Sequence, residues 1–112
     1  MSKIDMIIPA YNAHKTIERT LNSIAIQTII DDCNIIIVND CGNDYNSIID
    51  NRKGMSISQI TLSENSGPGI ARNIGMAAGN SPYFMFIDAD DTLYGCFALE
   101  IFLKTMEMYE HC

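Results

Sequence analysis

Three aspartates follow the apolar residues 83–87 near the end of the chain: Asp88, Asp90 and Asp91. Carboxylates this close together repel one another, and they stay ionised together only beside a cation or strong hydrogen-bond donors. Oxygen ligands at this density suit Mg²⁺ or Mn²⁺. The same residues also fit a solvated turn in which Asp91 and Thr92 cap the following helix. A metal site and a capped turn are therefore both open interpretations.

Three further side chains could bind a flat, phosphorylated ligand. Asp40 follows the most apolar run of the chain; a carboxylate there can accept from a base N–H or a ribose hydroxyl, although a turn-forming aspartate is more common. Tyr11 can stack on a ring or simply pack against the core. Arg72 is the only Lys or Arg between Gly54 and Leu103. Its guanidinium can reach a diphosphate, whereas the ordinary role of such a residue is on the surface of a helix.

Strands that alternate with helices must position these side chains. Apolar runs predict four strands, at residues 4–8, 34–39, 58–62 and 83–87. The second run, 34–39, is typical of a strand buried on both faces, as in a parallel sheet. Pro9 is expected to end the first strand. Helical spacing and composition predict helices at residues 13–28, 69–78 and 95–111, and a short polar helix that ends at Asn51.

Two details of these helices are specific predictions. Asn12 is expected to cap the first helix. The last helix is expected to bury one apolar face, which consists of Phe97, Ile101, Phe102 and Met106. Alternating strands and helices indicate βαβ units and a mostly parallel sheet. Because ligands of open α/β sheets bind beyond the carboxyl ends of the strands, the polar residues after each strand should converge on one edge, which is the strongest sign of a site.

Composition limits the possible functions. The 112 residues suffice for one domain, and 14 acidic against 7 basic residues give a net charge of −7. This acidic chain has no basic stripe, so nucleic acid is not an expected partner. Its four cysteines show no CxxC spacing, so zinc is not expected and the thiols are interpreted as reduced. No apolar run approaches the ~18 residues that span a bilayer.

Five blocks, in order along the chain, resemble the family 2 glycosyltransferases: IIPAYN at 7–12, TIERTLNSI at 16–24, VND at 38–40, NSGPGIARNIG at 65–75 and MFIDADD at 85–91. The resemblance implies a GT-A fold. That is a Rossmann-like three-layer αβα architecture with a mostly parallel sheet in the order 3-2-1-4, here incomplete on the C-terminal side. The family commonly has Asp-Asp-Gly-Ser where this chain has Asn39-Asp40-Cys41-Gly42, so the shape of that loop is not implied.

Members of the family transfer a sugar from a nucleotide-sugar donor, often a UDP-sugar, to a hydroxyl acceptor, usually with inversion. The implied role is in polysaccharide biosynthesis, with a saccharide or lipid-linked acceptor. The residues implied to bind the nucleotide are Pro9, Ala10, Tyr11, Asn12, Asp40, Arg72 and Asp88. Tyr11 would lie against the base, and Asp40 would accept from its N–H. Asp88 and Asp90 look like the DxD motif and would hold Mg²⁺ or Mn²⁺.

The family's catalytic base lies downstream of the DxD region, so no catalytic residue is assigned within 1–112. The chain is expected to be a single domain, the N-terminal nucleotide-binding half of a glycosyltransferase, that binds nucleotide but transfers no sugar alone. Uncovered apolar faces are expected to cause self-association, which sedimentation would detect. The expected location is the cytoplasm, with peripheral contact at the inner face of the membrane left open.

Two alternatives come from other classes of protein. A receiver-like phospho-acceptor domain is also α/β and of this size, but it needs acidic residues directly after the first strand and a lysine late in the chain. Here the sequence after that strand is PAYN, and Lys104 falls in a predicted helix. A non-catalytic nucleotide-binding or interaction domain would keep the fold, yet its affinity for nucleotide would not depend on Asp88 or Asp90.

Overall fold

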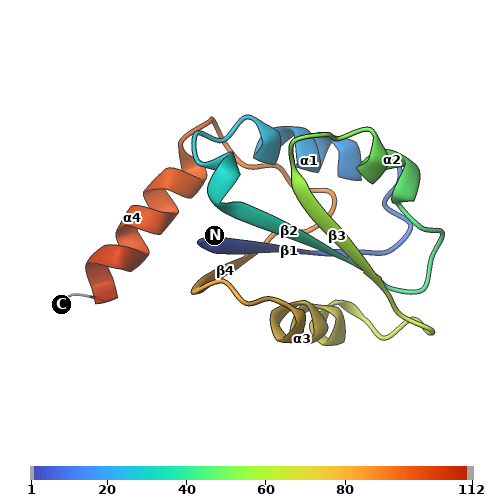
Figure 1. Cartoon of the computed structure of the whole chain (residues 1–112). Helices are drawn as coiled ribbons and strands as arrows, with labels where there is room; N and C mark the ends of the chain where they lie inside the picture. The colour runs from blue at the N-terminus through green and yellow to red at the C-terminus, as the bar shows by residue number, and fades with distance from the viewer. Residues whose placement is uncertain (1, 111–112) are drawn as a thin grey trace.

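The computed structural model describes residues 2–110, and within them four strands form one sheet with helices on both faces (Figure 1). The strands are β1 (Ile4–Ala10), β2 (Cys33–Asn39), β3 (Ser56–Thr61) and β4 (Tyr83–Phe86). The helices are α1 (Ile17–Ala25), α2 (Asn46–Asp50), α3 (Pro68–Ala78) and α4 (Ala98–Glu110), with a 3₁₀ turn, η1, at Ile30–Asp32.

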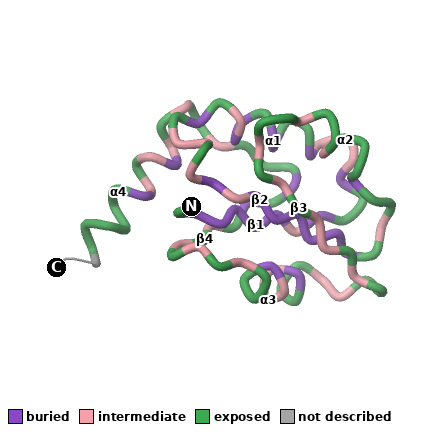
Figure 2. The backbone as a smooth tube through the Cα atoms, in the orientation of Figure 1, coloured by how far each residue is buried: buried purple, intermediate pink, exposed green. Residues whose placement is uncertain are grey.

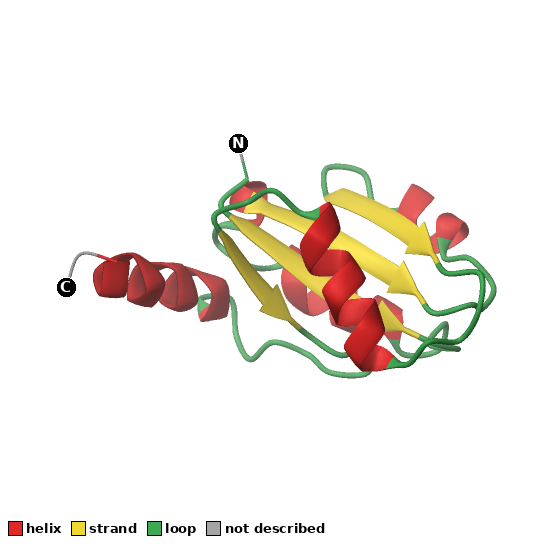
Figure 3. Cartoon of the chain, turned by 90° about the horizontal axis from the view of Figure 1, so that it is seen from below, coloured by secondary structure: helices red, strands yellow, loops and turns green. Residues whose placement is uncertain are grey.

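The strand order is β3-β2-β1-β4, and every pairing is parallel, as predicted. Helices α1 and α2 cover one face of the sheet and α3 covers the other, which makes three layers (Figure 1). Seen from below, α3 crosses over the strands while α4 extends away from them (Figure 3). The Rossmann-like α/β class is therefore confirmed. The central position of β1 brings its carboxyl end between those of β2 and β4.

The core divides between the two faces of the sheet. Alternate residues of β1 and β2 pack with α1, and the residues between them pack with Ala71 of α3. The residues on the α1 side are Ile4, Met6, Ile8, Ile35 and Ile37, and those on the α3 side are Ile7, Ile36 and Val38. Burial is accordingly concentrated along the central strands (Figure 2). This confirms the prediction of a strand at 34–39 that is buried on both faces.

Pro9 does not end β1, which continues to Ala10. The backbone N–H and C=O of Ile7 point toward β4, because the Ile7 carbonyl accepts the N–H of Ile87 at 3.1 Å. The backbone of Pro9, two residues later, points the same way. By then β4 has already ended at Phe86. The N–H that proline lacks is therefore not needed by any neighbouring strand.

The first helix begins later than predicted. Asn12 has φ 51°, a left-handed conformation, and it does not cap the helix. Both Thr16 and Ile17 donate their N–H groups to the carbonyl of Ala13, so a turn precedes α1. Thr16 takes the N-cap position without a side-chain cap, and the helix is shorter than residues 13–28. The helical spacing of the apolar residues predicted the helix but not the turn that leads into it.

The last helix buries a different face from the one predicted. Leu99 and Leu103 are buried, whereas Phe97, Ile101 and Met106 are exposed. Phe102, the fourth residue of the predicted face, is partly buried and packs against the core as predicted. The helix also begins at Ala98 rather than at residue 95, and residue 111 lies outside the described part of the chain. The prediction failed because a sequence with apolar residues on two sides does not say which side meets the sheet. The exposed residues of the predicted face, and Phe84 and Phe86 of β4, are apolar side chains of the kind that the self-association hypothesis requires.

Close contact between α3 and the sheet depends on Gly75. A Cβ added there would collide with the side chain of Ile7 and come within 3.2 Å of that of Val38. We expect Gly75→Ala to lower the free energy of unfolding by about 1–3 kcal/mol, because overpacking forces the strand and helix apart. Gly69→Ala, in the same helix with nothing within 4 Å of an added Cβ, is the matched control and should be neutral or stabilising by ~0.5–1 kcal/mol. Urea unfolding of both variants compares them; equal midpoints would contradict the prediction.

Candidate functional site

A groove of about 490 Å³ lies at the carboxyl ends of β1 and β4 and at the start of α3. Among the residues that line it are Pro9, Tyr11, Asn12, Pro68, Arg72, Asp88 and Asp90. A smaller pocket of about 160 Å³ shares Pro9, Tyr11 and Pro68 with the groove and adds Ala10 and Asp40. All eight residues predicted from the sequence to bind nucleotide or metal therefore line one of these two adjoining hollows.

Asp40 forms part of the smaller pocket and is buried, with 4% of its surface exposed. Its carboxylate oxygens accept the backbone N–H groups of Ser66 and Gly67, at 2.7 and 2.9 Å. Gly67 has φ 88° and directly precedes α3, so Asp40 holds the loop from which that helix begins. This anchoring role was not predicted from the sequence. A carboxylate has about four acceptor sites, so the two loop contacts leave capacity for the N–H of a ligand.

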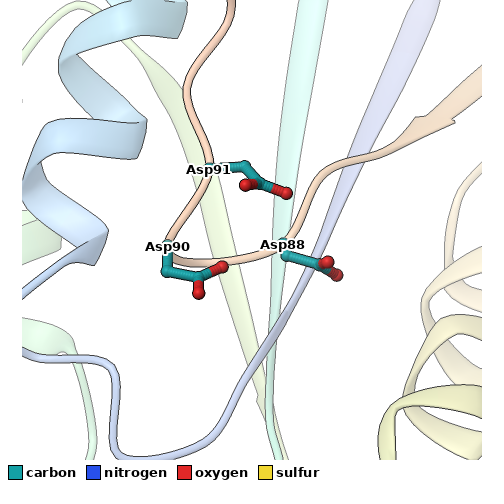
Figure 4. A group of neighbouring side chains, drawn as sticks. All are labelled: Asp88, Asp90 and Asp91. Carbon is teal, nitrogen blue, oxygen red and sulfur yellow. The ribbon is translucent and has the colours of Figure 1, made fainter.

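The three aspartates lie together beyond the end of β4 (Figure 4). One carboxylate oxygen from each of Asp88, Asp90 and Asp91 lies within 4.8 Å of the others, and all three residues are exposed. The predicted solvated turn is present, but the predicted cap by Asp91 and Thr92 is wrong, because α4 begins only at Ala98. Asp91 instead donates its backbone N–H to the carbonyl of Asp88, at 3.0 Å, which closes a turn that brings the carboxylates together. Three oxygen donors at this spacing fit a hard divalent cation.

Arg72 reaches this acidic group from α3. Its guanidinium lies 3.2 Å from a carboxylate oxygen of Asp88 and 5.9 Å from the centre of the Phe86 ring. These two contacts hold the Arg72 guanidinium against the wall of the groove. Arg19 also lies here, since its guanidinium donates to the backbone carbonyl of Asp90 at 3.5 Å. Three aspartates against these two arginines leave this end of the groove negative. A divalent cation would offset that charge.

Two other features of the described residues carry less chemistry. A larger hollow, of about 690 Å³, lies beside α2 and β3, but Asp44 is the only charged residue among those lining it. The cysteines within residues 2–110 are all free. Burial, with a smaller contribution from Asp32, raises the pKa of the Cys33 thiol to about 11, so that thiol is neutral. Cys112 and His111 lie outside the described residues.

Sequence reasoning missed the residues that hold the acidic loop in place. Thr20, Ser23 and Gln27 are buried and contact the backbone between Ala89 and Leu99. Their signal in the sequence is the helical spacing of polar residues beside the buried Leu21 and Ile24. Thr20 and Ser23 fall within the block at 16–24 that resembles the family, and Gln27 lies just beyond it. In the part of the chain that the structure describes, no helix has both the length and the hydrophobicity to cross a membrane.

The fold and the groove define an open α/β domain whose ligand site lies at the carboxyl edge of a parallel sheet and carries a donor set for a hard cation. Residues 5–111 match the family described as "Glycosyl transferase family 2". The chain belongs to this family, which excludes the receiver-like alternative. The fold is the GT-A type implied by the resemblance.

Three known proteins illustrate the relationship. Over 110 residues the chain is 41% identical to the teichoic acid poly(glycerol phosphate) polymerase of Staphylococcus epidermidis, covering 93% of this chain and 15% of that protein. S. aureus TarS 1-349 in complex with UDP-GlcNAc has a TM-score of 0.86 and 28% identity, over 96% of this chain and 32% of that one. The mannosyltransferase PcManGT of Pyrobaculum calidifontis, solved with GDP-Man and Mn²⁺, has a TM-score of 0.80 at 19% identity, over 87% of this chain and 30% of that one, which supports the fold alone.

Proposed function

We propose that this chain is the donor-binding part of a glycosyltransferase that uses a divalent cation to transfer a sugar from a UDP-sugar to a hydroxyl acceptor, with inversion. The observation that carries the proposal is the convergence of all eight predicted residues on two adjoining hollows. These residues come from four separate parts of the chain, and chance alone does not explain why their chemistry is complementary along one groove. TarS, solved with UDP-GlcNAc, supports the choice of a UDP-sugar.

The smaller pocket has the chemistry of a base-binding site. Tyr11 is half-exposed at its rim, where a ring can stack on it. Asp40 accepts hydrogen bonds but cannot donate them while it is ionised. A buried acceptor of this kind favours a ring that presents an N–H, as uracil does, over one that presents only acceptors. The ribose would then lie along Pro9 and Pro68, which the two hollows share.

The acidic end of the groove has the chemistry of a diphosphate site that depends on a cation. Asp88 and Asp90 would hold Mg²⁺ or Mn²⁺, and Asp91 lies near enough to supply a third oxygen. When bound, the cation would neutralise the negative charge that builds on the diphosphate as the bond to the sugar breaks. Arg72 would contact the phosphates from the opposite wall, already oriented by Asp88 and Phe86. This arrangement lets an acidic protein bind an anionic donor.

The chain spans 15% of the length of the S. epidermidis relative and 32% of the TarS chain. The acceptor, a saccharide or a lipid-linked one, and the catalytic base are therefore part of the proposal for the whole protein. We assign no base among the residues of this chain. Sugar transfer by the chain alone would contradict that assignment. Cytoplasmic location with contact at the inner face of the membrane, and self-association through the exposed apolar surface, belong to the same proposal.

Calorimetric titration of UDP in the presence of Mn²⁺ and of EDTA tests the donor site. We expect UDP to bind in both buffers, and to bind more tightly with Mn²⁺ by about tenfold or more. The reason is that the cation would supply charge-assisted contacts between the acidic end of the groove and the diphosphate. Equal affinity in the two buffers would contradict the metal-dependent part and favour a non-catalytic nucleotide-binding domain. Absence of binding in both would overturn the donor site itself.

A further inference from the structure

The acidic residues lie in a long segment without regular structure. Residues 87–97 contain neither helix nor strand. Their backbone N–H and C=O groups therefore lack the partners that regular structure provides, and each buried one needs a partner elsewhere. Ile87 and Ala89 are buried, so this segment is not a solvated loop throughout. Something other than its own secondary structure must fix its path, and with it the carboxylates of Asp90 and Asp91.

Thr20 of α1 contacts the backbone carbonyls of the two residues on either side of Asp90. Its hydroxyl lies 3.0 Å from the carbonyl oxygen of Ala89 and 2.6 Å from that of Asp91. A hydroxyl has one proton, so Thr20 donates it between the two carbonyls, with the shorter contact to Asp91. Thr20 is fully buried. Removing its hydroxyl would take this donor away from both carbonyls, at a buried contact for Ala89 and a partly buried one for Asp91.

Ser23 and Gln27 extend the same contact along the segment. The hydroxyl of Ser23 accepts the N–H of Leu93 at 3.0 Å and donates to the carbonyl of Thr20 at 2.7 Å. The amide of Gln27 donates to the carbonyl of Gly95 at 2.7 Å and accepts the N–H of Leu99 at 3.0 Å. The three side chains thus bind backbone groups at intervals from just before Asp90 to the first turn of α4.

These three residues are polar although their surroundings would suit apolar side chains. Thr20, Ser23 and Gln27 have exposed fractions of 0%, 8% and 2%, and they stand beside Leu21 and Ile24, which are fully buried in the core. Burying polar groups is unfavourable unless each finds a partner. Here the partners named above are backbone groups of Thr20, of the segment between β4 and α4, and of Leu99 in the first turn of α4, so the polar stripe serves that segment.

We propose that this polar stripe (Thr20, Ser23 and Gln27) positions the acidic group for the cation, with Thr20 as the decisive positioning residue. The inference rests on the proposed function, which is the source of the divalent cation. Thr20 touches neither metal nor nucleotide and acts only through the backbone carbonyls of Ala89 and Asp91, the neighbours of Asp90. Its hydroxyl sets the direction in which the Asp90 and Asp91 side chains leave the backbone. Metal affinity therefore depends on a buried residue of α1 that lies outside the groove.

Three variants test this proposal. Thr20→Val keeps the shape of the side chain but removes the donor, and Thr20→Ser keeps the donor. Ser23→Ala removes the acceptor of the Leu93 N–H and serves as a second variant. Ser81→Ala is the matched control: it deletes a hydroxyl that donates to Asp5 at 2.7 Å, at the turn between α3 and β4. It lowers stability without touching the acidic segment.

The measurements are Mn²⁺ affinity, from the electron paramagnetic resonance signal of free Mn²⁺ with UDP present, and UDP affinity in EDTA. We expect Thr20→Val to weaken Mn²⁺ binding by about 10–100-fold, the effect typical of partners that orient metal ligands, with UDP affinity in EDTA unchanged. Thr20→Ser should restore Mn²⁺ binding, and Ser81→Ala should keep it. Wild-type Mn²⁺ affinity in Thr20→Val, or an equal loss in Ser81→Ala, would overturn the positioning role.

Hydrogen exchange at the amides of Asp91 and Leu93 separates this inference from the proposed function. If the wild-type chain binds neither UDP nor Mn²⁺, the proposed function fails, and exchange still decides whether the stripe holds the segment. Faster exchange at both amides in Thr20→Val and at Leu93 in Ser23→Ala, with no change in Ser81→Ala, supports the holding role. Unchanged exchange in both stripe variants would overturn it.

Discussion

Replacing Asp90 with asparagine is expected to remove the metal-dependent part of UDP binding. Asp90 supplies one of the three carboxylate oxygens that lie within 4.8 Å of one another, and it lines the groove. Asparagine keeps the size of the side chain but replaces a charged ligand with a neutral one, and Mg²⁺ and Mn²⁺ prefer carboxylates. Mn²⁺ affinity in the presence of UDP should fall by about a hundredfold or more, since even outer partners of metal ligands contribute 10–100-fold.

The fold should tolerate this change. Asp90 is exposed, and the part of it that contacts the rest of the protein is its backbone carbonyl, which accepts from Arg19 at 3.5 Å. Surface substitutions of this type alter stability by about 0.5 kcal/mol or less. Asp50→Asn is the control for the loss of one negative charge. It removes the same charge at an exposed residue, at the end of α2. Mn²⁺-dependent UDP binding that survives in Asp90→Asn would exclude Asp90 as a ligand.

Asp40→Asn is expected to reduce both stability and nucleotide affinity. Asparagine can accept one of the two loop N–H groups, but its amide nitrogen would then face the other donor. Loss of a charge-assisted hydrogen bond at a buried site should lower the free energy of unfolding by about 2–3 kcal/mol. The loop of Ser66 and Gly67 would lose its anchor, and with it the position of Pro68 in the wall of both hollows.

Urea unfolding and UDP titration in EDTA measure the two effects separately. Asp44→Asn is the matched control, because the Asp44 carboxylate is exposed and accepts a single backbone N–H, from Asn46 at 3.0 Å. Asparagine can keep that contact, so its unfolding midpoint should stay close to that of the wild type. If Asp40→Asn unfolds at the wild-type urea concentration, the anchoring role is wrong. If it loses stability but binds UDP as the wild type does, Asp40 is an anchor without a role in base binding.

The acidic character of the chain and its proposed anionic ligand are compatible for a physical reason. The net charge of −7 would repel a diphosphate over most of the surface. At the groove the repulsion comes mainly from the three aspartates, which are also the residues suited to a cation. Donor affinity should therefore depend on the concentration of divalent cation more steeply than on total ionic strength. A protein that binds phosphate through lysine and arginine alone shows the opposite behaviour, because its affinity depends mainly on total ionic strength.

The sequence by itself determined the class of fold and the location of the site. Strand and helix types follow from the period of the apolar residues, a short-range property that does not require knowledge of the partners. The run at 34–39 predicted a strand buried on both faces, and β2 is such a strand. The rule that polar residues after parallel strands meet at one edge then predicted that Tyr11, Asp40 and Asp88 would come together.

Only the tertiary structure decided which groups these residues contact. Asp40 meets residues 26 and 27 positions away in the chain, and Thr20 meets Asp91 from 71 positions away. Such contacts depend on strand register and on the exact approach of α1 and α3 to the sheet, neither of which is encoded in local periodicity. The same reason explains why Leu99 and Leu103, and not Phe97 and Ile101, face the core. The choice between two apolar faces of one helix depends on the surface against which that helix packs.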